Sequence, residues 1–247
     1  MIRGIEYTKF KFPAGELHIK LIDATPRSVN LQFEFENMEE VYELLLLADT
    51  LKRNHIKIAS LEMPYVPFSR QDRVNEVGEC FSLDLFCKLI NSIRADEIVV
   101  TDPHSDVATA LLNNCRVIPQ HEIMGRYLGE KFDFWLICPD AGNLKKTYKL
   151  ASKVACAGVI ECSKLRNTKT GEITETRVYT DDLQGKECVI VDDICDGGRT
   201  FIEIAKVLKT KNCGKISLMV THGFFTKGLW VFDGLIDEVY DRKRRVK

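Results

Sequence analysis

Residues 188–200 read CVIVDDICDGGRT, in which an apolar run leads into two acids, a glycine pair and a threonine. The run at 188–191 is typical of a strand that is buried on both faces of a parallel sheet. After the loop, apolar residues recur at the spacing of one helical face, at Phe201, Ile204, Ala205 and Leu208. A strand, a glycine-containing loop and a helix in this order predict a parallel α/β sheet with the polar loop at its carboxyl edge.

The same alternation of apolar runs and amphipathic segments extends along the chain. Strand-like runs occur at 98–100, 134–138 and 216–220. Amphipathic helices are expected around residues 41–48 and 83–93, where apolar residues fall on one face. A new helix-strand-helix series begins near residue 123. We therefore place a boundary between an N-terminal α/β domain, 1–120, and a C-terminal α/β domain, 121–247.

One segment of the C-terminal half departs from this rhythm. Residues 158–179 have a polar middle at 167–172 that joins two strand-like flanks. This pattern predicts an exposed, mobile hairpin or flap.

Composition excludes several classes of protein. The 35 Lys and Arg residues balance 36 Asp and Glu residues, so the chain lacks the basic excess of a nucleic-acid-binding protein. Nine cysteines occur without a C-x-x-C pair, which favours a reducing compartment over a disulfide framework. No apolar run reaches the length of a membrane span, and the N-terminus does not resemble a signal peptide. We therefore expect a cytoplasmic protein with no nucleic-acid or membrane partner.

The loop that follows the 188–191 run has the composition of a phosphate site. Gly197, Gly198 and Thr200 open a helix, where backbone N–H groups and the helix dipole favour an anion. Asp192 and Asp193 beside such an anion are expected to bind a divalent metal or to accept hydrogen bonds from sugar hydroxyls. The alternative is structural, with Asp196 capping the helix and the two glycines forming a turn. The chain contains no Walker A motif.

Several further polar segments occur in an order that resembles the ribose-phosphate pyrophosphokinases, also called phosphoribosyl pyrophosphate synthetases. The resemblance covers most of the chain and rests on segments at 11–16, 70–73, 102–105, 139–143 and 192–200. Within the predicted flap, Lys164 and Arg166 fit the Lys-x-Arg of the family's flexible catalytic loop. The resemblance implies an α/β fold of two tandem phosphoribosyltransferase-like domains, each a mainly parallel sheet flanked by helices. The first domain would form the nucleotide side, and the second would carry the catalytic loop and the ribose-phosphate loop.

The resemblance also implies a reaction and a set of site residues. The β,γ-diphosphoryl group of ATP would move to the 1-hydroxyl of ribose 5-phosphate, giving phosphoribosyl pyrophosphate and AMP. Lys164 and Arg166 would be catalytic, and the Mg²⁺ cofactor would be held by His104 and Asp140. The implied ATP-binding residues are Phe12, Glu16, Arg70, Gln71, Asp72, Arg73 and His104. Those implied for ribose 5-phosphate are Arg166, Asp192, Asp193, Asp196, Gly197, Gly198, Arg199 and Thr200. The family's segment at 11–16 reaches the nucleotide of a neighbouring subunit, which implies a homo-oligomer with a shared nucleotide site.

Two alternative functions stay open from the sequence. A phosphoribosyltransferase would use the same loop at 192–200, although segment 70–73 and the Lys164/Arg166 pair argue against it. A catalytically silent homologue that regulates synthetase subunits is the other alternative. The presence of Lys164, Arg166, His104 and Asp140 argues against it, whereas the changes at Ala14 and Arg199 leave it open. Ala14 replaces an Asp, Gly197 replaces a Thr, and Arg199 replaces a Gly. We expect Arg199 to lie beside the 5-phosphate and to offset the hydroxyl lost at Gly197.

Overall fold

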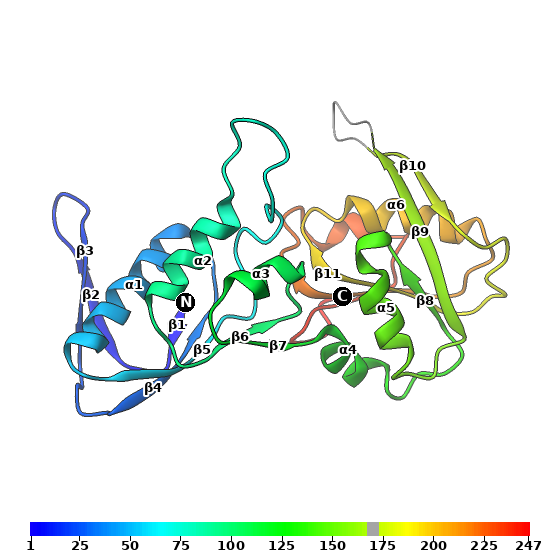
Figure 1. Ribbon diagram of the computed structural model, residues 1–247. Coiled ribbons are helices and arrows are strands. Elements are labelled where there is room, and N and C mark those ends of the chain that lie inside the picture. The colour runs from blue at the N-terminus through cyan, green and yellow to red at the C-terminus, as the bar shows by residue number, and fades with distance from the viewer. Residues whose placement is uncertain (167–172) are drawn as a thin grey trace. The chain divides into compact units, whose positions relative to one another are not determined.

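The computed structural model describes residues 1–166 and 173–247, with the backbone alone described at 165, 166, 173 and 174. The chain divides into two compact units, Met1–Ile118 and Pro119–Lys247. Each unit contains its own mainly parallel sheet (Figure 1). The two units are described separately below.

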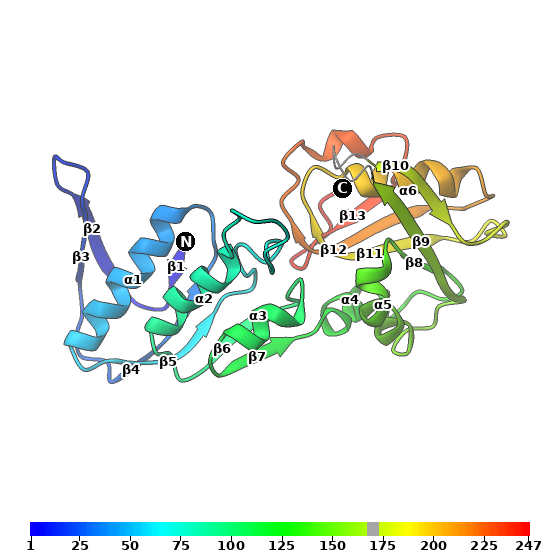
Figure 2. The same ribbon diagram turned by 45° about the horizontal axis from the view of Figure 1, so that its top comes forward.

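The first unit is built on a five-stranded sheet with the strand order β1-β4-β5-β6-β7. Only β1 runs antiparallel to its neighbour β4, and the other pairs are parallel. Because β4 to β7 follow one another both in sequence and in the sheet, right-handed crossovers place their connecting helices on one face, as Figure 2 shows. The strands are β1 (Ile2–Arg3), β4 (Ser28–Phe33), β5 (Lys57–Glu62), β6 (Ile98–Thr101) and β7 (Cys115–Ile118), and the helices are α1 (Met38–Arg53), α2 (Ser82–Ser92) and α3 (Asp106–Leu111).

A separate hairpin of β2 (Tyr7–Lys11) and β3 (Leu17–Leu21) completes this unit. It packs through β3, whose Ile19 and Leu21 are buried in the same core as the inward face of α1. Asn37 caps α1, since its side chain accepts a hydrogen bond from the Glu40 amide. The hairpin has no counterpart among the strands expected from sequence, because its β2 residues are mostly exposed and show no apolar run.

The second unit is a six-stranded sheet with the order β10-β9-β8-β11-β12-β13. All neighbouring pairs are parallel except β10 with β9. Its strands are β8 (Trp135–Cys138), β9 (Gly158–Arg166), β10 (Ile173–Val178), β11 (Cys188–Cys195), β12 (Ile216–Gly223) and β13 (Glu238–Tyr240). Its helices are α4 (Gln120–Leu128), α5 (Leu144–Ala151) and α6 (Arg199–Lys209), with short 3₁₀ turns η1 (Ala141–Asn143) and η2 (Leu229–Phe232).

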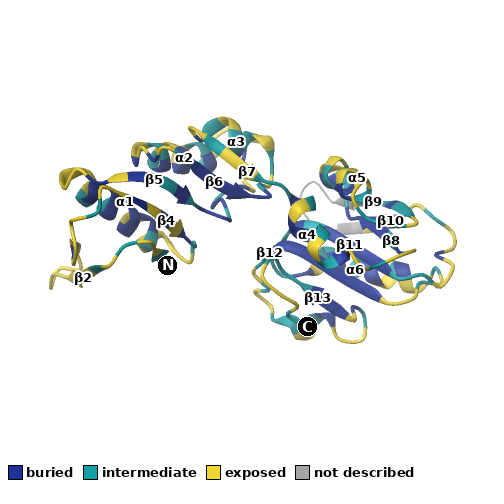
Figure 3. Cartoon of the chain, turned by 90° about the horizontal axis from the view of Figure 1, so that it is seen from below, coloured by how far each residue is buried: buried dark blue, intermediate teal, exposed yellow. Residues whose placement is uncertain are grey.

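The central strand β11 is buried on both faces (Figure 3). Cys188 and Ile190 belong to a core with α6, whereas Val189 and Val191 belong to a second core with α4 and α5. Alternate residues of a strand point to opposite faces, so a continuous apolar run is what such a position requires. The predicted mainly parallel α/β fold is therefore confirmed.

The structure refines the sequence-based expectation at the ends of β11 and β12 and in the hairpin at 158–179. β11 continues to Cys195 and β12 to Gly223, so the acids at 192 and 193 lie within a strand and not after it. The segment at 158–179 is an antiparallel hairpin of β9 and β10, as predicted, while its polar middle at 167–172 lies outside the described residues.

All nine cysteines are free thiols. In the part of the chain that is described, no helix has the length and apolar character needed to cross a bilayer.

Candidate active site

The carboxyl ends of two neighbouring parallel strands bring the acidic residues of the second unit together. Asp140 follows β8 and precedes η1, and Asp192 and Asp193 lie in β11. The two strands pair in parallel with Ile190 opposite Ile137, so their carboxyl ends lie at one edge of the sheet. Burial, followed by the charges of Asp193 and Asp140, raises the pKa of Asp192 well above its usual range. This edge therefore brings three carboxyl groups close together.

Lys164 supplies a cation to this acidic edge. Its Nζ atom lies 3.0 Å from Asp140 Oδ2 and 3.3 Å from Thr200 Oγ1. The side chain of Lys164 is only 7% exposed, whereas that of Asp140 is 44% exposed. Lys164 is thus buried in strand β9 and contacts the first turn of α6. The expectation that Lys164 is an exposed flap residue is wrong, because β9 extends past it and turns its side chain toward the neighbouring loops.

The loop between β11 and α6 has the backbone geometry of an anion site. Gly198 adopts φ = +78°, and a Cβ atom there would lie 2.7 Å from Cζ of Phe232. Both features require glycine. Helix α6 begins at the next residue, Arg199, so the positive end of its dipole points toward this loop. The structural alternative for Asp196, a cap on α6, is not what is found, since Gly198 occupies the N-cap position.

The segment after β12 closes one side of this loop. The Thr226 hydroxyl donates to Asp196 Oδ1 at 2.7 Å, and the Thr226 amide donates to the Asp196 carbonyl at 3.2 Å. The next residue, Lys227, lies over Gly197, whose missing Cβ position is 3.4 Å from Lys227 Cδ and 3.5 Å from its Cε. Within the described part of the chain, the Lys227 ammonium makes no hydrogen bond or ion pair.

Several of these neighbours were not predicted from the sequence. Lys227 and Thr226 reach the loop only because β11 and β12 pair in parallel, and no local motif marks them. Asn143 donates from Nδ2 to the Val191 carbonyl at 2.7 Å, which ties η1 to β11. Lys146 Nζ lies 3.8 Å from Asp193 Oδ2. The only feature of the sequence that could have marked Lys146 as a site residue is its position one helical turn after the 139–143 motif.

The remaining residues predicted for the ribose-phosphate loop are also located. Arg199 is exposed at the first position of α6, and within the described residues it has no hydrogen bond or ion pair. Thr200 is half-buried next to Lys164. Arg166 is the last residue of β9, and its side chain lies outside the described residues.

The residues predicted for ATP binding lie in the first unit and form two groups. In the first group, the Arg73 guanidinium donates to both carboxylate oxygens of Asp72 at 2.7 and 3.1 Å. Hydrogen bonds from Arg73 are the main cause of a lowered pKa at Asp72, and the positive potential of His104 contributes. The Ser82 hydroxyl donates to Gln71 Oε1 at 2.8 Å, which holds this segment to the start of α2. Arg70 is exposed in the same segment.

The second group consists of Phe12 and Glu16 at the tip of the β2–β3 hairpin. The tip is closed by a hydrogen bond from the Phe12 amide to the Glu16 carbonyl at 2.9 Å, and Gly15 provides a φ of +93°. Within the first unit, Figure 1 draws this tip at the opposite end from the segment between β5 and α2 that holds residues 70–73. The structure therefore does not bring the two predicted ATP-binding groups together in one chain.

Among the described residues, no three His, Cys, Asp or Glu side chains converge as metal ligands. His104 and Asp140, the two predicted ligands, belong to different units. The acidic edge around Asp192 nevertheless fits Mg²⁺, which typically keeps several waters and binds one or two carboxylates together with substrate phosphates.

Comparison with known proteins decides the family. Residues 109–228 match the model of the phosphoribosyl transferase domain. The chain is 30% identical over 223 residues to a ribose-phosphate pyrophosphokinase of Pyrococcus abyssi, covering 88% of this chain and 76% of that protein. It is 31% identical over 226 residues to the ribose-phosphate pyrophosphokinase of Corynebacterium efficiens, covering 87% and 68%. The chain belongs to the ribose-phosphate pyrophosphokinase family. The resemblance noted in the sequence is thereby confirmed.

A solved structure shows the same fold as this family member. The phosphoribosylpyrophosphate synthetase of Mycobacterium smegmatis superposes with a TM-score of 0.75 at 24% identity, covering 89% of this chain and 73% of that one. The fold of most of this chain is therefore that of a known member of the family.

Proposed function

We propose that this protein is a ribose-phosphate diphosphokinase that uses ATP and ribose 5-phosphate. The ribose 1-hydroxyl oxygen attacks the β-phosphorus of ATP and forms a new P–O bond. The bond from the β-phosphorus to the oxygen that bridges it to the α-phosphorus breaks, and AMP leaves with that oxygen. The hydroxyl proton passes to solvent, so phosphoribosyl pyrophosphate and AMP are the two products.

The contact that carries this proposal is the bridge made by Lys164. Its ammonium contacts both Asp140, at the acidic edge, and Thr200, in the first turn of α6 next to the glycine loop. A buried cation between a carboxylate and an anion-binding loop is suited to stabilise negative charge as a diphosphoryl group is transferred. We assign Lys164 to this role, together with Arg166, which lies on the same strand.

The loop residues are proposed to hold ribose 5-phosphate. The backbone of Gly197, Gly198 and Thr200 at the start of α6 would bind the 5-phosphate. Asp192 and Asp193 would accept hydrogen bonds from the ribose hydroxyls, as acidic residues do at other sugar sites. Asp196 would fix the loop through its hydrogen bond with Thr226. These contacts orient the substrate, which is the main task of a protein in phosphoryl transfer.

A product assay tests the reaction. Purified protein incubated with Mg²⁺, ATP and ribose 5-phosphate should release AMP only when ribose 5-phosphate is present. A phosphoribosyltransferase would instead convert a free base and phosphoribosyl pyrophosphate to a nucleotide. Absence of any product from either mixture would favour a silent regulatory homologue.

Mg²⁺ is the cofactor that the acidic edge fits. Asp140 and Asp192 would hold Mg²⁺ at the acidic edge of the second unit. In the first unit, His104 is the residue proposed to contact the metal of metal-ATP. When bound, Mg²⁺ would neutralise phosphate charge. The protein's own residues would orient the ribose hydroxyl, exclude water and keep the Lys164 ammonium at the transferring group.

Removal of divalent metal should abolish activity without unfolding the protein. The reason is that the acidic edge repels phosphates unless a cation is present, whereas the three hydrophobic cores are built from apolar side chains. Turnover and circular dichroism should be measured with a chelator and after adding Mg²⁺ back. His104→Ala should raise the Michaelis constant for metal-ATP and leave that for ribose 5-phosphate nearly unchanged. A selective loss of ribose 5-phosphate affinity would show that His104 is assigned to the wrong substrate.

The nucleotide site is proposed to be shared between subunits of a homo-oligomer. Within the first unit, the tip of the β2–β3 hairpin and the segment between β5 and α2 lie at opposite ends (Figure 1). A second copy could place its hairpin tip against this segment. This arrangement would let both predicted groups contact one ATP molecule.

Gly197 replaces a Thr of the family pattern, so one hydroxyl donor to the 5-phosphate is missing. Arg199 and Lys227 are both candidates for a cation that compensates for this loss. Arg199→Gly should raise the Michaelis constant for ribose 5-phosphate, with smaller changes for ATP and in turnover, because a phosphate contact acts in the ground state and the transition state alike. Lys227→Met tests the competing cation, and Lys206→Met, on the exposed face of α6, is the matched control. If Lys227→Met raises this constant and Arg199→Gly does not, the offsetting cation is Lys227 and Arg199 is a tolerated surface residue.

A further inference from the structure

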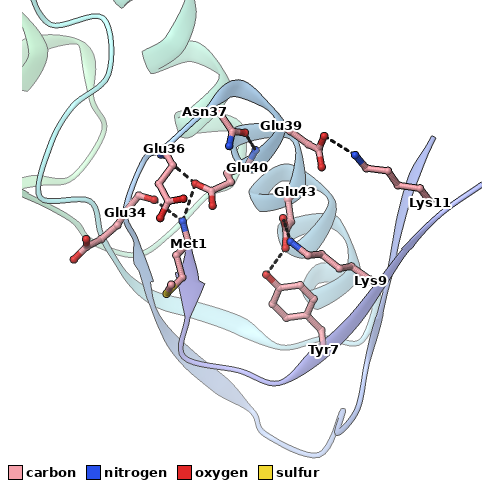
Figure 4. Close-up of polar contacts among 10 residues, drawn as sticks. All are labelled: Met1, Tyr7, Lys9, Lys11, Glu34, Glu36, Asn37, Glu39, Glu40 and Glu43. Atoms are coloured by element: carbon pink, nitrogen blue, oxygen red, sulfur yellow. Dashed lines mark hydrogen bonds and ion pairs between the residues drawn. The ribbon is translucent and has the colours of Figure 1, made fainter. Parts of the chain in front are cut away.

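A single buried carboxylate fastens the β2–β3 hairpin to helix α1 (Figure 4). The Tyr7 hydroxyl donates to Glu43 Oε1 at 2.7 Å, and Lys9 Nζ donates to Glu43 Oε2 at 2.9 Å. The side chain of Glu43 is only 5% exposed. Both of its oxygens are therefore engaged by alternate residues of one strand, which fixes the position and the rotation of β2 on the helix.

A second, outer contact continues the same face of β2. Lys11 Nζ lies 2.7 Å from Glu39 Oε2, one helical turn before Glu43. The side chains of this pair are 50% and 53% exposed, so water screens the attraction. The two contacts involve the same helix face and the same strand but differ in burial, which makes Glu39 a matched control for Glu43.

The buried contact is the stronger one on electrostatic grounds. Burial, followed by Glu43 itself, raises the pKa of the Tyr7 hydroxyl, so this group is a donor throughout the neutral range. A hydrogen bond to Glu43 is also the main cause of a raised pKa at Lys9. A hydrogen bond to a buried charged group contributes several times more to stability than an exposed ion pair.

The hairpin needs such a fastening because it is isolated from the main sheet. A two-stranded hairpin is marginally stable by itself. Here the fully buried apolar residues, Ile19 and Leu21, come from β3, whereas β2 contributes the partly buried Tyr7 to the same core. Beyond the fastening, the opposite face of the hairpin presents Phe10, Phe12 and His18. The ring centroids of Phe10 lie 5.0 Å from Phe12 and 5.2 Å from His18, and both Phe side chains are about half exposed, at 48% and 47%. An exposed aromatic surface of this kind suits stacking against a nucleobase.

We propose that Glu43 is a positioning residue that holds this aromatic surface in the orientation needed to receive the nucleobase of ATP. The proposal rests on the proposed role of the hairpin in nucleotide binding. Glu43 acts through Tyr7 and Lys9 and does not itself touch the substrate. Its loss should therefore affect ATP affinity and leave ribose 5-phosphate affinity and turnover largely unchanged.

The test compares Glu43→Gln with Glu39→Gln, two variants with the same change of charge on the same helix face. Glu43→Gln should raise the Michaelis constant for ATP about tenfold, the change expected from losing one hydrogen bond to a charged group. Turnover at saturation and the Michaelis constant for ribose 5-phosphate should change less than about twofold, as should all constants of Glu39→Gln. Tyr7→Phe keeps the Lys9 ion pair and provides a milder variant, which should raise the ATP constant in the same selective way.

Hydrogen exchange tests the fastening without relying on activity. Amides of residues 7–21 should exchange at least about tenfold faster in Glu43→Gln, while those of β4 to β7 keep their wild-type rates. Faster exchange with an unchanged ATP constant would overturn the positioning role, and unchanged exchange would overturn the fastening itself. Equal effects on both substrates, or from Glu39→Gln, would also overturn the proposal. If the wild-type protein releases no AMP, the proposed function fails, and ATP titration by calorimetry then decides whether Glu43 controls nucleotide binding.

Discussion

Replacing Lys164 by methionine is expected to lower turnover by at least ~100-fold, the scale for losing one preorganised donor that stabilises charge in the transition state. Methionine keeps the length and apolar packing of the side chain but removes the ammonium that contacts Asp140 and Thr200. The Michaelis constants should change much less than turnover, because the contact strengthens as the diphosphoryl group is transferred. Steady-state kinetics with both substrates measure this difference.

The structure also changes the expected effect of Lys164 on stability. An exposed flap residue would leave the melting temperature unchanged, but the buried Lys164 offsets the charge of Asp140 beside Asp192. We therefore expect Lys164→Met to lower the melting temperature by about 2–4 °C.

Two variants serve as controls for Lys164. Lys164→Arg, which keeps the charge, should retain the melting temperature. Lys146→Met removes a different cation near Asp193 and should retain most of the turnover. Turnover in Lys164→Met within about tenfold of wild type would remove Lys164 from the mechanism.

Asp192→Asn is expected to weaken the binding of ribose 5-phosphate while making the substrate-free protein more stable. The pKa of Asp192 is raised in the folded protein, mainly by burial and then by Asp193 and Asp140. A folded pKa above the unfolded value means that the ionised carboxylate destabilises the fold at neutral pH. This penalty disappears as the pH falls through the raised pKa and the group takes up a proton. A neutral amide removes the penalty at all pH values.

Thermal unfolding and kinetics together measure this trade-off. Without substrates, Asp192→Asn should melt about 2–4 °C above wild type at pH 7, and the difference should shrink as the pH is lowered. Its Michaelis constant for ribose 5-phosphate should rise at least about tenfold, since the amide cannot replace a charged acceptor for the ribose hydroxyls. Asp181→Asn, an exposed acid after β10, is the control and should change neither property. An Asp192→Asn variant with a lower melting temperature and an unchanged Michaelis constant for ribose 5-phosphate would contradict both the electrostatic penalty and the binding role assigned to Asp192.

The sequence predicted the second unit better than the first. The run at 188–191 and the spacing of Phe201, Ile204 and Leu208 identified β11 and α6, because strands buried on both faces and amphipathic helices have strong periodic signals. The β2–β3 hairpin gave no comparable signal. Its β2 strand is exposed and is held through Tyr7 and Lys9, polar contacts to a helix more than 30 residues away.

The residues of the candidate site were predictable only where they lie in a short motif at the carboxyl end of a strand. Asp140, Asp192 and Gly198 lie on short motifs at the sheet edge, so local sequence reveals them. The burial of Lys164 was not predictable, since its contacts with Asp140 and Thr200 depend on the pairing of β9 with β8. Lys227 was missed for a related reason, because it reaches Gly197 through the parallel pairing of β11 with β12.

The central claim is the transfer of a diphosphoryl group to the 1-hydroxyl of ribose 5-phosphate. The most direct measurement is ³¹P nuclear magnetic resonance of a reaction containing the protein, Mg²⁺, ATP and ribose 5-phosphate. The account predicts equal amounts of two products. One is AMP, and the other is a ribose that carries its 5-phosphate and a diphosphate on the C1 oxygen, whose two phosphorus nuclei are coupled to each other. Formation of ADP with a singly phosphorylated C1, or a spectrum that retains only the two substrates, would contradict it.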